Sequence, residues 1–443
     1  MKNKFMSDIA KKVEPQKIKK SLTGEIPAGW SSVLLEEVLE TIESGMRPKG
    51  GVNAESGDIP SFGGENIKPD GGVVYAGVNK VPLSFYQSMP KGILKDKDVL
   101  INKDGAWTGK VGLYNASVYP EACINEHLFI LRGNPKYLTQ EFLYYLLLSD
   151  DGQTKLGRVI SGSAQPGLGA SFPRFFNVQV PTIKEQKAIV DVLCSIDDVI
   201  ARTRDLVSQM RVTNTGLIGS LLTRGLPGQH KKYKKAEIGE IPFEWRCVRL
   251  KELLKEPIKN GYSPNCPQVV SGKWMLTLGA VTHNGFNPAG KKPAPVDDMR
   301  CDENLLKKGD LLVSRSNVRN RVGLAGVYEG NPENCSYPDL LMRIRLQEST
   351  VLVYWLEKWL LSGKGRAYME REARGTSGSM VKIDRRILEN LLVPLPPVSE
   401  QREILKSVLC LNAAESINLR YLSELKKIKT VLMKELLTGK VRV

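Results

Sequence analysis

The pattern of apolar and polar positions along the chain occurs twice, and the second occurrence lies 215 residues after the first. The positions that keep this shift are Gly-Glu-Ile-Pro at 24–27 and 239–242, Trp30 and Trp245, Glu185-Gln186 and Glu400-Gln401, and Leu-Leu-Thr at 221–223 and 436–438. The residues between these positions differ between the copies. A repeat of this kind predicts two copies of one domain plan with divergent interiors.

Within each copy, short apolar runs predict buried strands, and a longer apolar segment predicts a helix. The predicted strands are 97–101 and 127–131 in the first copy and 309–313 and 341–345 in the second. The helix of the first copy is expected at 140–148 with Thr139 as its N-cap, and its counterpart is expected at 351–361. Strands and helices in this order predict an α/β (α+β) fold.

The period changes after the last strand of each copy, which ends at Pro181 in the first and at the prolines 394, 396 and 397 in the second. Beyond these prolines, apolar residues recur in alternating steps of four and three, which is the spacing of a coiled-coil seam. The seam residues are Ile189, Leu193, Ile196, Ile200, Val207, Met210, Leu217 and Leu221 in the first copy, and Ile404, Val408, Leu411, Leu422, Leu425, Leu432 and Leu436 in the second. Two such helices predict an antiparallel coiled coil whose polar seam positions fix the register. In the alternative, each helix packs only on its own domain.

These patterns divide the chain into six segments. They are a basic N-terminal arm at 1–23, a first repeat domain at 24–181, a long helix at 182–226, a basic linker at 227–238, a second repeat domain at 239–396, and a second long helix at 397–443. The expected architecture is two duplicated domains related by a pseudo-two-fold axis and joined by the two long helices.

Charge indicates the kind of partner. Lys and Arg number 64 against 48 acidic residues, which gives a formal charge of +16, and residues 221–443 carry +14 of it. Such a surplus favours a polyanionic partner. No apolar run is long enough to span a membrane, and the first 20 residues lack the apolar core of a signal peptide, so a cytoplasmic location is expected.

The sequence shows no complete catalytic or metal site. Its seven cysteines form no Cys-x-x-Cys pair, and its three histidines do not cluster. His127 falls in an apolar run and is expected in the core, whereas His230 falls in a Lys-rich linker and is expected to be exposed. Two alternatives stay open: a nuclease or methyltransferase with an unrecognised site, and a scaffold whose charge serves another protein.

Polar, Gly-bearing loops at equivalent places in the two copies are the candidates for nucleic-acid binding. Arg and Lys donate to guanine or to phosphates, and Asn and Gln pair with adenine. The candidate DNA-binding residues are Lys103, Trp107, Lys110, Ser163 and Gln165 in the first copy, and Arg315, Asn317, Arg319, Asn320, Arg321, Arg374 and Thr376 in the second.

These motifs together resemble the specificity subunits of type I restriction–modification systems, and the resemblance spans nearly the whole chain. The residues that carry it are the Gly-Glu-Ile-Pro…Trp starts, Asp98-Val99-Leu100, Lys110-Val111-Gly112, Ser161 to Leu168, Glu185-Gln186, Arg321-Val322-Gly323 and Glu400-Gln401. The chain departs from the family at 375–379, where Gly-Thr-Ser-Gly-Ser replaces the Ser-Ala-Gln-Pro loop.

The resemblance implies a non-catalytic subunit that binds double-stranded DNA. Each repeat domain would be a target recognition domain for one half of a bipartite, asymmetric site. The long helices would dock modification (methyltransferase) subunits, two being expected, and restriction (translocase and nuclease) subunits would join them. The chain itself would hold no cofactor and no metal, since S-adenosylmethionine would belong to the modification subunit, and ATP and Mg²⁺ to the restriction subunit.

Overall fold

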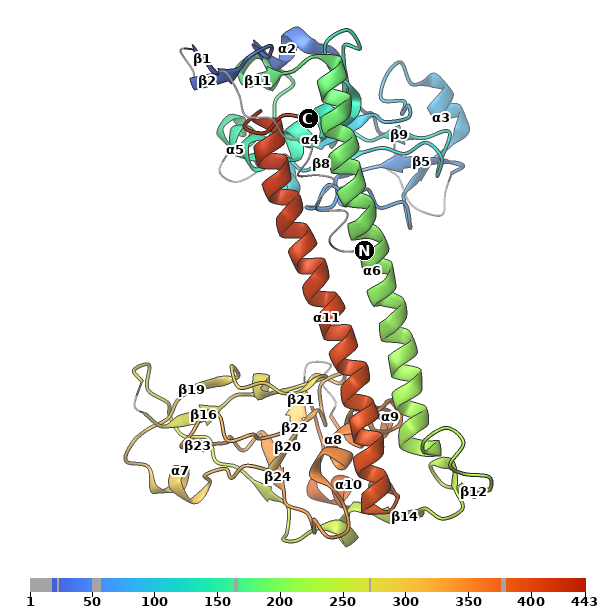
Figure 1. Ribbon diagram of the computed structural model, residues 1–443, viewed down its shortest axis with the longest axis vertical. Coiled ribbons are helices and arrows are strands. Elements are labelled where there is room, and N and C mark those ends of the chain that lie inside the picture. The colour runs from blue at the N-terminus through green and yellow to red at the C-terminus, as the bar shows by residue number, and fades with distance from the viewer. Residues whose placement is uncertain (1–17, 22–23, 50–56, 163–165, 271, 376–379) are drawn as a thin grey trace. The chain divides into compact units, whose positions relative to one another are not determined.

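The structure is a computed structural model, and it describes residues 18–21, 24–49, 57–162, 166–270, 272–375 and 380–443. The chain forms two compact units (Figure 1). Unit 1 consists of residues 1–204 and 420–443, and unit 2 consists of residues 205–419. Because the break falls inside both long helices, each unit contains one half of each helix.

The centre of unit 1 is a four-stranded antiparallel sheet. Its strands lie in the order β4 (Leu39–Ser44), β10 (Leu128–Gly133), β7 (Val99–Asn102) and β8 (Val111–Leu113). Smaller sheets join β6 (Lys80–Val81), β5 (Ile59–Phe62) and β9 (Cys123–Ile124), then β11 (Asn177–Val180) with β3 (Ser31–Leu34), and β1 (Ile18–Ser21) with β2 (Gly24–Pro27). The remaining helices are α2 (Leu35–Val38), α3 (Leu83–Ser88), α4 (Gln140–Leu148) and α5 (Asp150–Val159).

Both faces of this sheet are buried, which explains why its central strands are continuously apolar. Val99 and Ile101 point to the face that α4 covers with Phe142, whereas Leu100 points to the opposite face, toward Phe62. Side chains alternate between the faces of a strand, so a strand covered on both sides needs an apolar residue at every position.

The predicted helix at 140–148 is confirmed, and the Thr139 side chain accepts a hydrogen bond from the Phe142 amide (3.4 Å).

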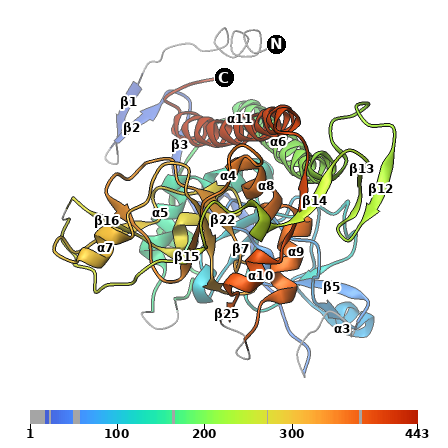
Figure 2. The same cartoon turned by 90° about the horizontal axis from the view of Figure 1, so that it is seen from below.

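Unit 2 repeats this plan. Its four-stranded sheet has the order β15 (Lys259–Asn260), β24 (Leu341–Ile344), β20 (Leu311–Ser314) and β22 (Ala325–Val327). A three-stranded sheet has the order β19 (Lys291–Pro293), β16 (Trp274–Leu276) and β23 (Cys335–Ser336). Four strand pairs complete the described part of the unit: β14 (Arg246–Arg249) with β26 (Leu392–Leu395), β17 (Val281–Thr282) with β18 (Gly285–Phe286), β21 (Ser316–Asn317) with β25 (Val381–Lys382), and β12 (Tyr233–Ala236) with β13 (Gly239–Pro242). The β12–β13 hairpin is seen in Figure 2. Its shorter helices are α7 (Met299–Glu303), α8 (Val353–Leu361), α9 (Gly363–Glu372) and α10 (Arg385–Glu389). The duplicated fold is therefore confirmed.

The two long helices, α6 (Ile183–Arg224) and α11 (Val398–Leu437), pack against each other in both units. In unit 1, Ile196 and Ile200 of α6 meet Leu425 of α11. In unit 2, the Asn214 side chain donates a hydrogen bond to the Leu411 carbonyl (3.2 Å). Within unit 2, Arg211 pairs with Glu415 (3.0 Å) and Asn214 with Leu411, so the contacts advance along α6 while they retreat along α11, and the two helices are antiparallel there.

Several seam residues pack on the core of a domain in addition to the other long helix. Ile189, Leu193 and Leu436 join the core of unit 1, and Leu221, Ile404 and Val408 join the core of unit 2, so these positions pack on the domain as well as along the pair. Leu217 is a wrong prediction, because its side chain is 46% exposed and Ile218 packs on the core instead. A straight helix of 3.6 residues per turn drifts from a 3.5-residue repeat, which moves the buried position by one residue.

The Glu-Gln pair at the start of each long helix attaches that helix to its domain. Gln186 is fully buried, receives a hydrogen bond from the Thr139 amide (2.9 Å) and donates to the Tyr137 carbonyl (2.7 Å). Gln401 is equally buried and receives one from the Leu352 amide (2.8 Å). Gln186 and Gln401 therefore occupy equivalent places in the two copies because each satisfies backbone groups that would otherwise be buried without a partner.

The repeated tryptophans bind the neighbouring glutamates. The indole of Trp30 donates to Glu185 (3.1 Å), and that of Trp245 donates to Glu400 (2.9 Å). Arg442 then pairs with Glu185, while His230 hydrogen-bonds Glu400 (2.7 Å). The expectation that His230 is exposed is therefore wrong: its side chain is only 9% exposed, because a carboxylate and an indole enclose it.

The aspartates that open the two central strands have structural roles. Asp98 accepts two hydrogen bonds from Arg132 of β10 (2.7 and 2.6 Å), and Arg132 also reaches Glu43 (2.6 Å). Arg345, Asp310 and Glu256 form the same triad in unit 2. Burial raises the pKa of the Asp98 carboxyl, and its hydrogen bonds to Arg132 oppose that rise. These residues fix the sheet from which the candidate loops leave.

Candidate nucleic-acid interface

Two loops of unit 1 that are distant in sequence lie together. The first loop (102–110) follows β7, and the second loop (161–168) follows α5. The Leu168 amide donates to the Lys103 carbonyl (2.6 Å), and the Thr108 hydroxyl donates to the Pro166 carbonyl (3.0 Å). The structure thus brings the first loop together with the described part of the second loop, residues 161–162 and 166–168.

The corresponding loops of unit 2 meet in the same way. The first loop (314–321) follows β20, and the second loop (374–382, of which the structure describes 374–375 and 380–382) follows α9. The Ile383 amide donates to the Arg315 carbonyl (2.9 Å), and β21 in the first loop pairs with β25 in the second. We call each such set of two loops a loop pair.

Backbone hydrogen bonds define which residues of the two loop pairs are equivalent. The Lys103 amide donates to the His127 carbonyl (3.0 Å), and the Arg315 amide donates to the Leu340 carbonyl (2.8 Å). Together with the bonds from Leu168 and Ile383, this makes Lys103 equivalent to Arg315. The same register makes His127 equivalent to Leu340, Asp104 to Ser316 and Gly167 to Lys382. The frame is shared, and the side chains on it differ.

The predicted residues of unit 1 lie on the exposed side of this frame. Trp107 is 49% exposed, and the ammonium group of Lys110 lies over its ring, 2.8 Å from the ring centre. Lys103 is half-buried and donates to the Ser44 hydroxyl (3.1 Å). Ser163 and Gln165 lie outside the described residues.

The predicted residues of unit 2 include four arginines. Arg319, Arg321 and Arg374 are exposed, as is Asn320, whereas Arg315 and Asn317 are half-buried. Arg319 donates to the Glu370 carbonyl of α9 (2.6 Å), and Arg315 donates to the Asp339 carbonyl (3.4 Å). Thr376 lies outside the described residues.

Three residues at these surfaces were not identified from the sequence. Lys382 is exposed on the second loop of unit 2. Arg366 is buried beneath the first loop and donates to the Val322 carbonyl (2.6 Å), so it supports the loop. His127 was expected in the core, which is wrong: its side chain is 42% exposed, and its Nδ1 lies 2.7 Å from the Asp104 carboxylate. The strand begins at Leu128, so His127 lies just before it and is not one of its buried positions.

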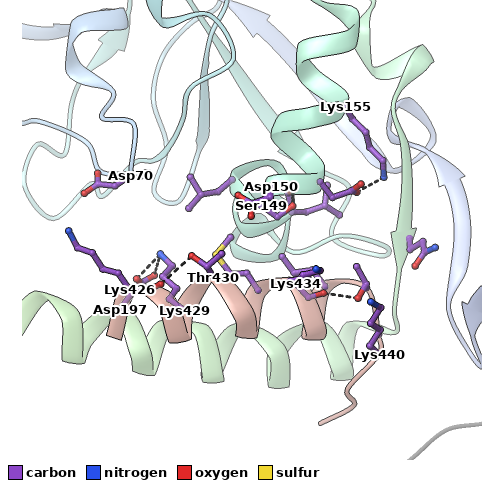
Figure 3. Close-up of a pocket in the computed structure, with 18 of the residues that line it drawn as sticks. Asp70, Ser149, Asp150, Lys155, Asp197, Lys426, Lys429, Thr430, Lys434 and Lys440 are labelled. Atoms are coloured by element: carbon purple, nitrogen blue, oxygen red, sulfur yellow. Dashed lines mark hydrogen bonds and ion pairs between the residues drawn. The ribbon is translucent and has the colours of Figure 1, made fainter. Parts of the chain in front are cut away.

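Unit 1 also contains a pocket of about 1180 Å³, formed by the last turns of α11, the corner between α4 and α5, and α6 (Figure 3). Lys429 of α11 pairs with Asp197 of α6 (2.7 Å), and Asp197 accepts a hydrogen bond from Tyr145 of α4 (2.8 Å). These contacts join the helix pair to the domain. Within the described residues, no group of three or more His, Cys, Asp and Glu side chains is placed to hold a metal ion. None of the described helices is long and apolar enough to cross a membrane.

Comparison with known proteins agrees with this architecture. Residues 27–209 match the family described as the type I restriction modification DNA specificity domain. The MjaVIII specificity subunit of Methanocaldococcus jannaschii is 23% identical over 94% of this chain and 94% of its own length. The EcoKI specificity subunit of Escherichia coli is 22% identical over 87% of this chain and 82% of its own.

The fold has a relative among solved structures. A chain from a structure titled as the basis of complex assembly and conformational transition of the type I R-M system covers 93% of this chain and 98% of its own length, with a TM-score of 0.61 and 20% identity. Residues 27–209 thus match the DNA specificity domain family, and the chain as a whole is similar over nearly its full length to the specificity subunits of type I restriction–modification systems.

Proposed function

We propose that this chain is the non-catalytic DNA reader of a type I restriction–modification complex, in which each unit reads one half of a bipartite, asymmetric site. One observation carries the proposal: the two units present equivalent loop pairs with different side chains. A shared frame presents donors and acceptors at equivalent places, and different side chains select different bases. Lys103 of unit 1 is equivalent to Arg315 of unit 2, and Gly167 of unit 1 is equivalent to Lys382 of unit 2.

The two loop pairs differ in charge. In unit 2, Arg315, Arg319, Arg321, Arg374 and Lys382 all lie on the loop pair. In unit 1, Lys103 and Lys110 are accompanied by the carboxylate of Asp104. Phosphate contacts supply salt-dependent affinity, so we infer that unit 2 contributes more of it than unit 1 does.

The long helices are the proposed docking surface for modification subunits. Several apolar side chains point outward from them in unit 2: Val212 is 74% exposed, Leu409 63% and Ile417 64%. Val431 of unit 1 is also exposed. Apolar side chains on the outer face of a helix favour contact with a partner protein. The partners would bring S-adenosylmethionine, and a restriction subunit would bring ATP and Mg²⁺.

The test uses the complex and the chain alone. The complex with its modification subunits should methylate DNA at one bipartite sequence, found by mapping modified bases in genomic DNA. The purified chain, mixed with S-adenosylmethionine and DNA, should transfer no methyl group. Turnover by the chain alone would support the alternative that it is an enzyme, and methylation without a bipartite sequence would contradict the two-reader proposal.

A further inference from the structure

We propose that Asp104, held by His127, is a specificity-determining residue of unit 1 that reads the exocyclic amino group of one base in its half-site. The inference rests on the proposed function. Asp104 directly follows Lys103 in the first loop, and its backbone pairs with Gly167 of the second loop. Its side chain is 41% exposed and that of His127 is 42% exposed, so both open on the surface that the loop pair forms.

A carboxylate at this place is costly for general DNA binding, because it repels phosphates. Local folding does not account for it either. Asp104 immediately precedes the short 3-10 turn of Gly105–Trp107, yet its side chain makes no capping hydrogen bond to that turn. Among the described residues, its hydrogen-bond partner is the His127 ring. The carboxylate is therefore held in place and remains partly open to solvent.

The chemistry of a fixed carboxylate selects its ligand. An ionised carboxylate only accepts hydrogen bonds, so it suits an amino group and repels a carbonyl or a phosphate. In the major groove, such donors are the N4 amino group of cytosine and the N6 amino group of adenine. Thymine and guanine present acceptors at the corresponding places, so Asp104 discriminates against them.

His127 is a positioning residue in this arrangement. Because the carboxylate accepts, the ring donates from Nδ1 across the 2.7 Å contact, which fixes the ring orientation. Its Nε2 lies 3.5 Å from Glu126, which is paired with Arg47 (3.1 Å). The charged groups around the ring are thus Asp104 on the first loop, its neighbour Glu126, and Arg47 beyond β4.

Unit 2 has no such pair at the equivalent positions. Ser316 replaces Asp104 and is buried, and Leu340 replaces His127. The half-site of unit 2 therefore lacks this carboxylate reader, which contributes to the asymmetry of the whole site.

The test measures the affinity of the complex for the cognate duplex and for duplexes with single base-pair changes. In Asp104→Ala, discrimination at one base pair of the unit 1 half-site should fall roughly tenfold or more, while other positions keep theirs. His127→Ala should lower discrimination at the same base pair by a smaller factor. His127→Asn should keep the discrimination at that base pair that His127→Ala loses, because the asparagine amide nitrogen can donate to Asp104 in place of Nδ1. Asp104→Asn, which keeps the side-chain shape, should change discrimination at that same pair.

Other outcomes overturn the inference. If Asp104→Ala and Asp104→Asn bind every duplex more tightly by one common factor, the carboxylate only repels phosphates. If discrimination changes at base pairs of both half-sites while the complex still assembles, Asp104 does not read one base pair of the unit 1 half-site, and the inference fails. The charge-matched control is Asp70→Ala, which should leave every ratio unchanged. A double variant, Lys103→Ala with Lys110→Ala, separates the two proposals: if it leaves DNA affinity unaltered, the loop pair of unit 1 is not a DNA surface and the proposed function fails as well.

Discussion

Removal of two arginines from unit 2 tests whether its loop pair binds the DNA backbone. Arg319 and Arg321 are exposed neighbours on the first loop, and Arg319 is tethered to the Glu370 carbonyl. If each contacts one phosphate, the double variant Arg319→Ala with Arg321→Ala lowers the slope of log affinity against log salt by about 1.8, at about 0.9 per contact. Between 0.05 and 0.2 M salt, the wild type should then lose about 12-fold more affinity than the variant.

The assay is fluorescence anisotropy of labelled duplexes with the assembled complex, at four or more salt concentrations. Arg300→Ala is the matched control, because Arg300 lies in the same unit, outside the loop pair, and its side chain is 65% exposed. The control should keep the wild-type slope. If one of the two arginines contacts a base instead, the single variant loses roughly 1–3 kcal/mol of discrimination at one base pair of one half-site. An unchanged slope together with unchanged specificity would refute the assignment of this loop to DNA.

Three further predictions concern the scaffold. Gln401→Ala should lower the free energy of unfolding, measured by denaturant titration, by about 3 kcal/mol. The substitution leaves the Leu352 amide and the Thr350 and Pro396 carbonyls without their buried partner. The exposed-site control Arg402→Ala should change the free energy of unfolding little. Leu409→Asp with Ile417→Asp should weaken binding of the modification subunit roughly tenfold or more while the DNA half-sites stay the same, and unaltered assembly would contradict the docking surface. Seven residues inserted into both α6 and α11, in register, add about 10 Å to each helix and should lengthen the spacer between half-sites by up to roughly three base pairs. An insertion of four residues should instead rotate the apolar seam and impair assembly. Efficient methylation with an unchanged spacer would show that the helices do not set the spacing.

The sequence predicted the elements well where a single period decides them. The repeat shift, the helix at 140–148 with its Thr139 cap and the two long helices all depend on local patterns, and the structure contains them. Leu217 failed because a heptad was extended past the point where the helix leaves the 3.5-residue repeat. His127 failed because one polar residue at the edge of an apolar run is not separable from the strand by period alone.

The site was predictable only as separate loops. That Lys103 lies beside Leu168, and Arg315 beside Ile383, depends on pairing between segments more than 60 residues apart, which no local pattern encodes. His230 illustrates the same limit: the Lys-rich linker indicated exposure, but Glu400 and Trp245, distant in sequence, enclose the ring. The signal that could have found it is that both enclosing residues keep their positions in the repeat.

Exchange of one domain tests the central claim most directly. Residues 25–180 are replaced by the equivalent segment of a related specificity subunit with a known, different site, and modified bases are mapped in cells that contain the hybrid and the modification subunit. Because each unit has its own sheet and its own loop pair, one half-site should change to that of the donor and the other should stay as in the parent. A change in both half-sites, or in neither, from a hybrid that assembles and methylates would contradict the claim that the two units are separate readers.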